Sequence, residues 1–140
     1  MDSGRISRRH LLQASAALTL GSTLGVRTAS AAETTIGFIY VGSRDDYGYN
    51  QAHALGAAAV KGLPGLKVVE EEKVAETDAV EKTMESMINL DGATLLFPTS
   101  FGYYSPHMIK MASKYPKLRF EHCGGLWTDK DPKNACSYFG

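Results

Sequence analysis

Apolar runs alternate with segments of helical period along most of the chain, from about residue 35 onward. Continuous apolar runs at 35–41 and 93–98 predict strands that are covered on both faces of a sheet. The runs at 66–71 and 117–123 also carry charged side chains, which is typical of strands nearer a sheet edge. A short run at 136–140 predicts the beginning of a fifth strand.

Three segments between these strands have the period of helices. We expect the first helix at 50–62 and the second to begin near Asp78, where Glu81 would complete a capping box. The pair Ser105-Pro106 predicts the start of the third helix. The apolar positions at helical spacing are Ala52, Leu55, Ala59 and Leu63 in the first helix, Val80, Met84, Met87 and Ile88 in the second, and Met108, Ala112 and Tyr115 in the third.

This alternation predicts an α/β fold with a parallel sheet and helices on both of its faces. Because strands one and three are the most apolar, they belong in the centre, which gives the strand order 2-1-3-4, with the fifth strand beyond the fourth. In such a sheet the binding crevice lies outside the carboxyl ends of the strands, where the order reverses. Here that point lies between strands one and three.

Residues 1–31 have the features of an export signal, which leaves 32–140 as the folded part. A basic start at Arg5, Arg8 and Arg9 precedes a weakly apolar stretch, and small residues at 29–32 form a cleavage site after Ala31 or Ala32. The Arg8-Arg9 pair resembles a twin-arginine signal, and an ordinary secretory signal is the alternative. We therefore expect a soluble periplasmic protein, without a lipid anchor because no cysteine lies at the cleavage site.

Charge and composition exclude several classes of partner. The chain has a formal net charge of zero, and removal of the leader leaves about −3. This charge gives no reason to expect a nucleic acid or an anionic membrane surface as partner. The glycine-rich loops match neither of the common phosphate-binding patterns, so a nucleotide phosphate is not the obvious ligand.

Three loops should meet at the carboxyl edge of the sheet, and each combines glycine with aromatic side chains. The loop after strand one contains Asp46, Tyr49 and Asn50. The loop after strand three is segment 99–106, and the loop after strand four is segment 123–127. This clustering favours a site for a flat, polar ring, and the alternative is that the rings cover the sheet edge or pack under a second domain. The aromatic residues in question are Tyr47, Tyr49, Phe101, Tyr103, Tyr104 and Trp127.

Asp46 and Asn50 could orient such a ligand, because the carboxylate accepts hydrogen bonds and the amide both donates and accepts them. The alternative is local: Asn50 caps the helix, and Asp45 or Asp46 is a favourable charge at its N-terminus. No nucleophile motif surrounds the loop serines, and the histidines and cysteines lack zinc spacing, so we expect no catalytic residue, metal or cofactor. Cys123 and Cys136 either form a disulfide or remain buried thiols.

The chain resembles the BMP (basic membrane protein) family of ABC-importer solute-binding proteins in an ordered set of segments. These are the strand at 36–42, then Asp46, Tyr49 and Asn50, then 99–103, 118–125 and 134–140. The resemblance covers nearly all of the chain after the leader. It implies a cleft between two lobes that holds purine nucleosides or related bases, and an ABC permease as partner. Since family members have two lobes, it also implies that this chain is an incomplete first lobe with weak or no affinity of its own.

By position, the resemblance places Asp46 and Asn50 in polar contacts with the ligand and Tyr49 against a ring face, with Ser100 and Phe101 as a second wall. The full set of residues that we expect around the ligand is Asp46, Tyr49, Asn50, Ser100, Phe101, Gly102, Gly124 and Trp127. Two alternatives stay open: an exported hydrolase or nucleosidase that uses Asp45 and Asp46, and a ligand-sensing domain of a signalling receptor.

Overall fold

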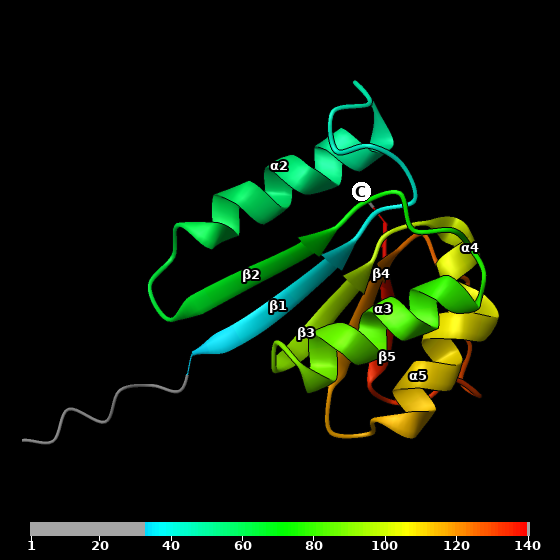
Figure 1. Ribbon diagram of the computed structural model, residues 1–140. Helices are drawn as coiled ribbons and strands as arrows, with labels where there is room; N and C mark the ends of the chain where they lie inside the picture. The colour runs from blue at the N-terminus through cyan, green and yellow to red at the C-terminus, as the bar shows by residue number, and fades with distance from the viewer. Residues whose placement is uncertain (1–32, 140) are drawn as a thin grey trace, which may run out of the picture.

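The computed structural model describes residues 33–139, which form one five-stranded parallel sheet with helices on both faces (Figure 1). The strand order β2-β1-β3-β4-β5 confirms the predicted order, including the fifth strand. The expected leader, 1–31, lies outside the described residues. The strands are β1 (Thr34–Ile39), β2 (Leu66–Glu71), β3 (Ala93–Pro98), β4 (Arg119–Cys123) and β5 (Ala135–Tyr138).

Helices α3 (Asp78–Asn89) and α5 (Ile109–Lys114) cover one face of the sheet, together with a short helical turn α4 (Phe101–Tyr103) and a π-helical turn η1 (Tyr104–Met108). Helix α2 (Tyr49–Lys61) lies alone on the opposite face (Figure 1). The larger core lies under α3 and α5, and Gly37 of β1 lets α3 approach closely, since a Cβ there would lie 2.8 Å from the Met87 sulfur. The smaller core, under α2, contains Ile36, Phe38, Tyr40 and Ala57.

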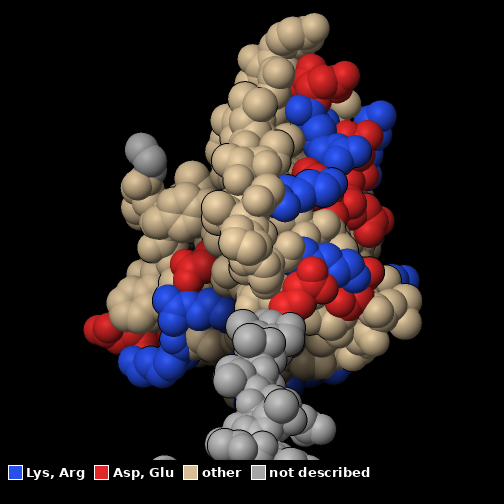
Figure 2. Space-filling model, turned by 90° about the vertical axis from the view of Figure 1, so that its left-hand side faces the viewer, with Lys and Arg blue, Asp and Glu red and all other residues tan. Residues whose placement is uncertain are grey.

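The edge position predicted for β2 is confirmed by its pairing with β1 alone among the described strands. Ion pairs follow this edge, such as Lys67 with Asp91 at 3.6 Å and Arg44 with Glu70 at 3.5 Å. Figure 2, viewed from this side of the molecule, shows acidic and basic side chains interleaved along one flank. Such mixed charge discourages pairing of the exposed edge with another strand.

The apolar positions whose spacing predicts α2 are not the ones that it buries. Leu55 and Leu63 are exposed, whereas Ala57 is fully buried with Ala54 and Val60 beside it. Alanine occurs on all sides of this helix, so the apolar pattern fixes its existence but not which face points inward. In α3, by contrast, Val80, Met84 and Met87 are buried as predicted and Ile88 is half-buried.

The second helix begins at Asp78, as predicted, but its capping box and the predicted start of the third helix differ from the structure. Thr77 caps α3, accepting a hydrogen bond from the Ala79 amide at 3.3 Å, and Glu81 contacts another helix instead of completing a capping box. The helical region before α5 begins at Phe101, and Ser105 interrupts it with extended backbone angles, φ −126° and ψ 128°. Ser105 precedes Pro106, and a residue before proline disfavours helical backbone angles, which explains the interruption.

Cys123 and Cys136 are free, half-buried thiols in the structure, so the disulfide alternative is wrong and the thiols are less buried than expected. On the neighbouring strands β4 and β5, Cys136 lies opposite Glu121 and Cys123 opposite Tyr138, a separation of two positions. With a rise of about 3.3 Å per residue and strands about 4.8 Å apart, the two Cα atoms are about 8 Å apart. A disulfide requires a Cα separation below about 7 Å.

Membrane-spanning helices were sought among residues 33–139, and none there is both long enough and apolar enough to cross a bilayer.

Candidate ligand-binding site

The loops after β1, β3 and β4 meet at one edge of the sheet, as predicted. The Tyr49 hydroxyl donates a hydrogen bond to the Thr99 carbonyl at 2.5 Å, which joins the first loop to the second. Nε2 of the buried His122, at the end of β4, lies 2.7 Å from the Ser100 carbonyl, which joins the third segment to the second. Burial lowers the pKa of His122, so its ring is held neutral in this contact.

Asp46 organises the loop between β1 and α2. One carboxylate oxygen accepts hydrogen bonds from the Gly48 and Gln51 amides at 2.9 and 3.0 Å, and the other from the amide and side chain of Asn50 at 3.2 and 2.8 Å. The bonds from Gln51 and the Asn50 side chain are the main reason that the pKa of Asp46 falls to about 2. Asp46 therefore stabilises the N-terminus of α2, the local role that the sequence left open for Asp45 or Asp46. Capping by Asn50 is wrong, because the cap residue is Gly48 and Asn50 lies within the helix.

Asn50 has one polar atom that the described protein leaves without a partner. The residue is 7 % exposed, and its side-chain nitrogen is used by Asp46, but its side-chain oxygen makes no hydrogen bond. Gly42 makes room for this amide, since a Cβ there would lie 2.7 Å from its nitrogen. A buried acceptor without a donor costs about 1–3 kcal/mol, so this oxygen is suited to an N–H or O–H group from outside the chain.

Tyr49 exposes its ring at the carboxyl edge of the sheet where these loops meet, called the rim below, while its hydroxyl is held by a hydrogen bond. The side chain is 45 % exposed, and its ring packs at a tilt against His53 with centroids 4.4 Å apart. Burial of the oxygen, followed by the nearby Cys123, raises the pKa of the Tyr49 hydroxyl. The residue is thus neutral and fixed in orientation, as a stacking surface must be.

The other aromatic residues of the predicted cluster divide into two groups. Phe101 is 65 % exposed and lines the cavity described below, whereas Trp127 is 44 % exposed and lines a separate hollow with Ala135 and Cys136 of β5. Tyr103 and Tyr104 are buried in the core, where their hydroxyls donate to the Val74 carbonyl at 2.5 Å and to Asp131 at 2.9 Å. Their inclusion in the rim cluster was wrong, because a tyrosine beside a strand end can equally turn inward once its hydroxyl finds a partner.

The cavity next to Phe101 lies further out than predicted. Its volume is about 400 Å³, and it opens between the loop after β3 and the loop after β4 instead of between β1 and β3. Its lining includes Phe101 and Gly102 but not Asp46, Tyr49 or Asn50. Among the described residues, the predicted ligand residues therefore do not line one common cavity. Gly124, whose φ of +81° suits glycine, ends β4 and does not line this cavity.

Glu76, in the loop between β2 and α3, is a functional candidate that the sequence reasoning missed. Its carboxylate accepts hydrogen bonds from the Ser100 hydroxyl and from the Gly102 amide, the latter at 3.0 Å. It thereby joins a fourth loop to the site. The sequence did indicate that this loop lies near the site, because the loop after β2 must also emerge at the carboxyl edge of a parallel sheet.

The geometry disfavours the hydrolase alternative that used Asp45 and Asp46. A carboxyl group with a pKa near 2 and four donors around it stays ionised and cannot act as a general acid near neutral pH. Asp45 is turned to its own loop, where it accepts a hydrogen bond from the Ser43 hydroxyl. The two carboxylates thus stabilise the loop individually.

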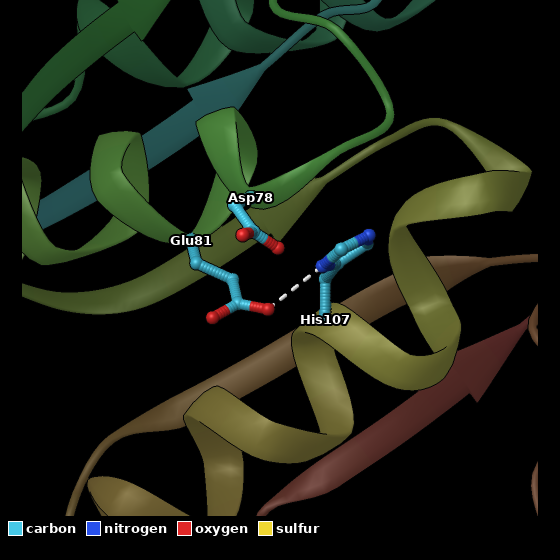
Figure 3. Close-up of side chains that lie close together, drawn as sticks. All are labelled: Asp78, Glu81 and His107. Carbon is cyan, nitrogen blue, oxygen red and sulfur yellow. Dashed lines mark hydrogen bonds and ion pairs between the residues drawn. The ribbon is translucent and has the colours of Figure 1, made fainter.

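Asp78, Glu81 and His107 form a separate cluster of metal-ligand type (Figure 3). Their candidate ligand atoms lie within 4.8 Å of one another, on α3 and η1. However, the two Glu81 oxygens already contact His107 Nδ1 at 2.8 Å and Lys110 Nζ at 2.5 Å. The cluster is therefore an ion-pair network that connects α3 to η1 and α5, in which the Lys110 ammonium group supplies the positive charge.

A family model described as "ABC transporter substrate-binding protein PnrA-like", named Bmp, matches residues 33–140. The chain belongs to the Bmp family. This family consists of solute-binding rather than enzymatic proteins, and substrate-binding proteins of ABC transporters generally act outside the cytoplasm. The family resemblance expected from the sequence is thus confirmed.

Individual relatives of this Bmp chain agree with the family assignment. A purine-binding protein of Brucella abortus (strain 2308) is 34 % identical over 110 residues, which cover 77 % of this chain and 31 % of that protein. The chain thus spans about a third of the length of this relative.

Two solved structures share the fold. A solute-binding protein of an ABC transporter system from Aeropyrum pernix K1 has a TM-score of 0.64 at 22 % identity, over 76 % of this chain and 28 % of that chain. A lipoprotein fragment from Peptoclostridium difficile 630 has a TM-score of 0.63 at 17 % identity, over 76 % of this chain and 84 % of that chain. At these identities the likeness concerns the fold, and it confirms the α/β architecture of ABC solute-binding proteins.

Proposed function

We propose that this Bmp-family chain forms the first lobe of a periplasmic solute-binding protein and that the solute is a purine nucleoside, nucleobase or similar heterocycle. The observation that carries the proposal is the composition of the rim. Accessible aromatic rings, of Tyr49, Phe101 and Trp127, follow the ends of β1, β3 and β4, and Asn50 has a buried side-chain oxygen without a partner among the described residues. The name of the Brucella relative as purine-binding supports the same ligand class.

In this proposal the protein binds its solute without chemical change. Tyr49 stacks on one face of the base, Phe101 and Trp127 form a second wall, and Asn50 accepts a hydrogen bond from the ligand. Asp46 holds Asn50 and the start of α2 in place, while Ser100, Gly102 and Gly124 supply backbone close to the ligand. A second lobe then closes over the solute, and the closed form docks on an ABC permease.

The proposal also covers export of the protein to the periplasm. Residues 1–31 would direct export through the twin-arginine pathway, and 32–140 would form the lobe. The proposed partners are therefore the small-molecule ligand and a permease of the inner membrane.

The test is a titration of the isotope-labelled chain with adenosine, inosine and guanosine, followed by amide chemical shifts in NMR. We expect a dissociation constant of about 1 mM, because one lobe contacts only part of the solute. The shifts should concentrate at Gly48, Asn50 and the 100–102 segment. Tyr49→Ala should weaken binding by about tenfold or more, since stacking of a base on an aromatic ring contributes about 1–3 kcal/mol.

Leu55→Ala is the matched control, because Leu55 lies exposed on the same helix, outside the rim. It should leave the titration unchanged. Shifts scattered over the surface, or equal affinities in Tyr49→Ala and the parent chain, would contradict the stacking role.

A further inference from the structure

Helix N-termini at the rim are already occupied by carboxylates of the chain itself. Asp46 accepts hydrogen bonds from three backbone amides at the start of α2, those of Gly48, Asn50 and Gln51. Glu76 takes the Gly102 amide, at the start of α4, and the Ser100 hydroxyl beside it. Free amides at such positions are where proteins commonly bind phosphate groups. Here these amides are bonded to carboxylates, so an anionic ligand would lie next to negative charge instead of free amides.

Glu76 fills the space directly over the segment that carries Phe101. A Cβ added to Gly102 would lie 2.5 Å from the Glu76 carboxyl carbon, so the carboxylate is in van der Waals contact with this backbone. Phe101, one residue away, is 65 % exposed at the rim. The negative charge therefore lies beside the wall against which we propose that the solute binds.

The basic side chains of the neighbouring loops do not offset this charge. Arg44 turns to the β2 edge, where it pairs with Glu70 at 3.5 Å and Glu72 at 3.4 Å. Lys73 lies 3.9 Å from the same Glu72. Asp46 stays ionised at any pH above about 2, as its lowered pKa requires. The part of the rim formed by the loops after β1, β2 and β3 is therefore anionic.

We propose that Glu76, together with Asp46, makes this site selective for neutral solutes over anionic ones, and in particular for a nucleoside over its monophosphate. The inference rests on the proposed function and adds the basis of its charge selectivity. Discrimination arises because a phosphate would face like charge and find no free amides, while a neutral ribose or base would not. Glu76 is a specificity-determining residue in this scheme, and it also positions Ser100 and Gly102.

The experiment compares adenosine with adenosine 5′-monophosphate in NMR titrations of the whole chain, and the readout is the ratio of their two dissociation constants. We expect the monophosphate to bind at least about tenfold more weakly. Glu76→Gln keeps the size of the side chain and an acceptor for Gly102 but removes the charge, so the ratio should fall by about fivefold or more. Glu85→Gln removes a carboxylate of α3 that pairs with Lys114 instead, and should leave the ratio unchanged.

Salt provides a second readout on the parent chain that does not depend on a variant folding. Raising the ionic strength from about 0.01 to 1 M shortens the screening length from about 30 to 3 Å, so the ratio should fall toward that of Glu76→Gln. Adenosine binding with a ratio that neither Glu76→Gln nor salt alters would overturn this inference alone. Absence of binding by either solute would overturn the proposed function and the inference with it.

Discussion

Asp46 is the residue on which the order of the β1–α2 loop depends. One side chain bonds the Gly48 amide before the helix and the Asn50 and Gln51 amides within it. It also holds Tyr47 between them with a positive φ of 56°, a conformation that disfavours a side chain. The sequence offered ligand contact and helix capping as separate roles for this loop. The structure assigns stabilisation of the helix N-terminus to Asp46 and leaves the free acceptor on Asn50.

The lowered pKa of Asp46 makes its contribution to stability dependent on pH. Because the folded-state pKa, about 2, lies below the ordinary value of 3.8, the contribution is fully present above pH 4 and is lost as the pH falls through 2. We expect Asp46→Asn to lower the Tm at pH 7, and the difference from the parent chain to shrink between pH 4 and pH 2. Calorimetry across this range measures it.

Asp45→Asn is the control for this prediction, because Asp45 is exposed and bonds only to the side chain of Ser43 among the described contacts. It should shift the Tm much less at pH 7. A Tm difference for Asp46→Asn that persists unchanged below pH 2 would show that the charge of Asp46 is unimportant.

The site residues differ in how far the sequence could predict them. Tyr49, Asn50 and Phe101 follow strand ends, so the topology alone brings them to the rim. Tyr103 has the same position in the pattern and points inward, because only the folded structure provides the Val74 carbonyl that receives its hydroxyl. The topology also brings the loop that contains Glu76 to this edge, but the partners that distinguish Glu76 within that loop, 24 and 26 residues away, become neighbours only when the loops assemble.

At the scale of helices, contact between α3 and the η1–α5 region depends on Glu81. Its side chain is 12 % exposed and bridges His107 on η1 to Lys110 on α5. The hydrogen bond from Lys110, then that from His107, lowers the pKa of Glu81. The sequence pattern suggested a capping box instead, since a Glu three residues into a helix is as suitable for a local bond as for a tertiary one.

We expect Glu81→Gln to reduce the free energy of unfolding by about 1 kcal/mol at pH 7, the usual contribution of one charged hydrogen bond at a partly exposed site. Because the folded-state pKa is depressed, this contribution is present above the ordinary value of 4.5 and is lost as the pH falls below it. Urea unfolding at pH 7 and at pH 3 measures both values. Lys82→Gln, an exposed change one residue along α3, should have little effect at either pH. Equal losses at pH 7 and pH 3 would contradict the ion-pair interpretation.

At the scale of the whole molecule, strand order was predictable from the sequence because charged side chains are rarely buried in the centre of a sheet. A strand with neighbours and helices on all sides has no room for charges, so β1 and β3 had to be central and β2 an edge. The inward face of α2 was not predictable, since alanine is compatible with either side. The face that is buried is the one that packs on Phe38 and Tyr40, and only the folded structure shows which side of the helix meets them.

This arrangement predicts a gradient of stability across the sheet. β1 pairs with both β2 and β3, whereas β2 and β5 each have one partner among the described strands. Amides of β1 and β3 should therefore exchange with solvent only through global unfolding, and those of β5 also through local opening. In native-state hydrogen exchange, we expect protection in β1 and β3 to fall with added urea at the global slope. In β5, protection should be lower and nearly independent of urea, because local opening exposes little new surface. Protection of β5 equal to that of β1, with the same urea slope, would show instead that the sheet opens only as one unit.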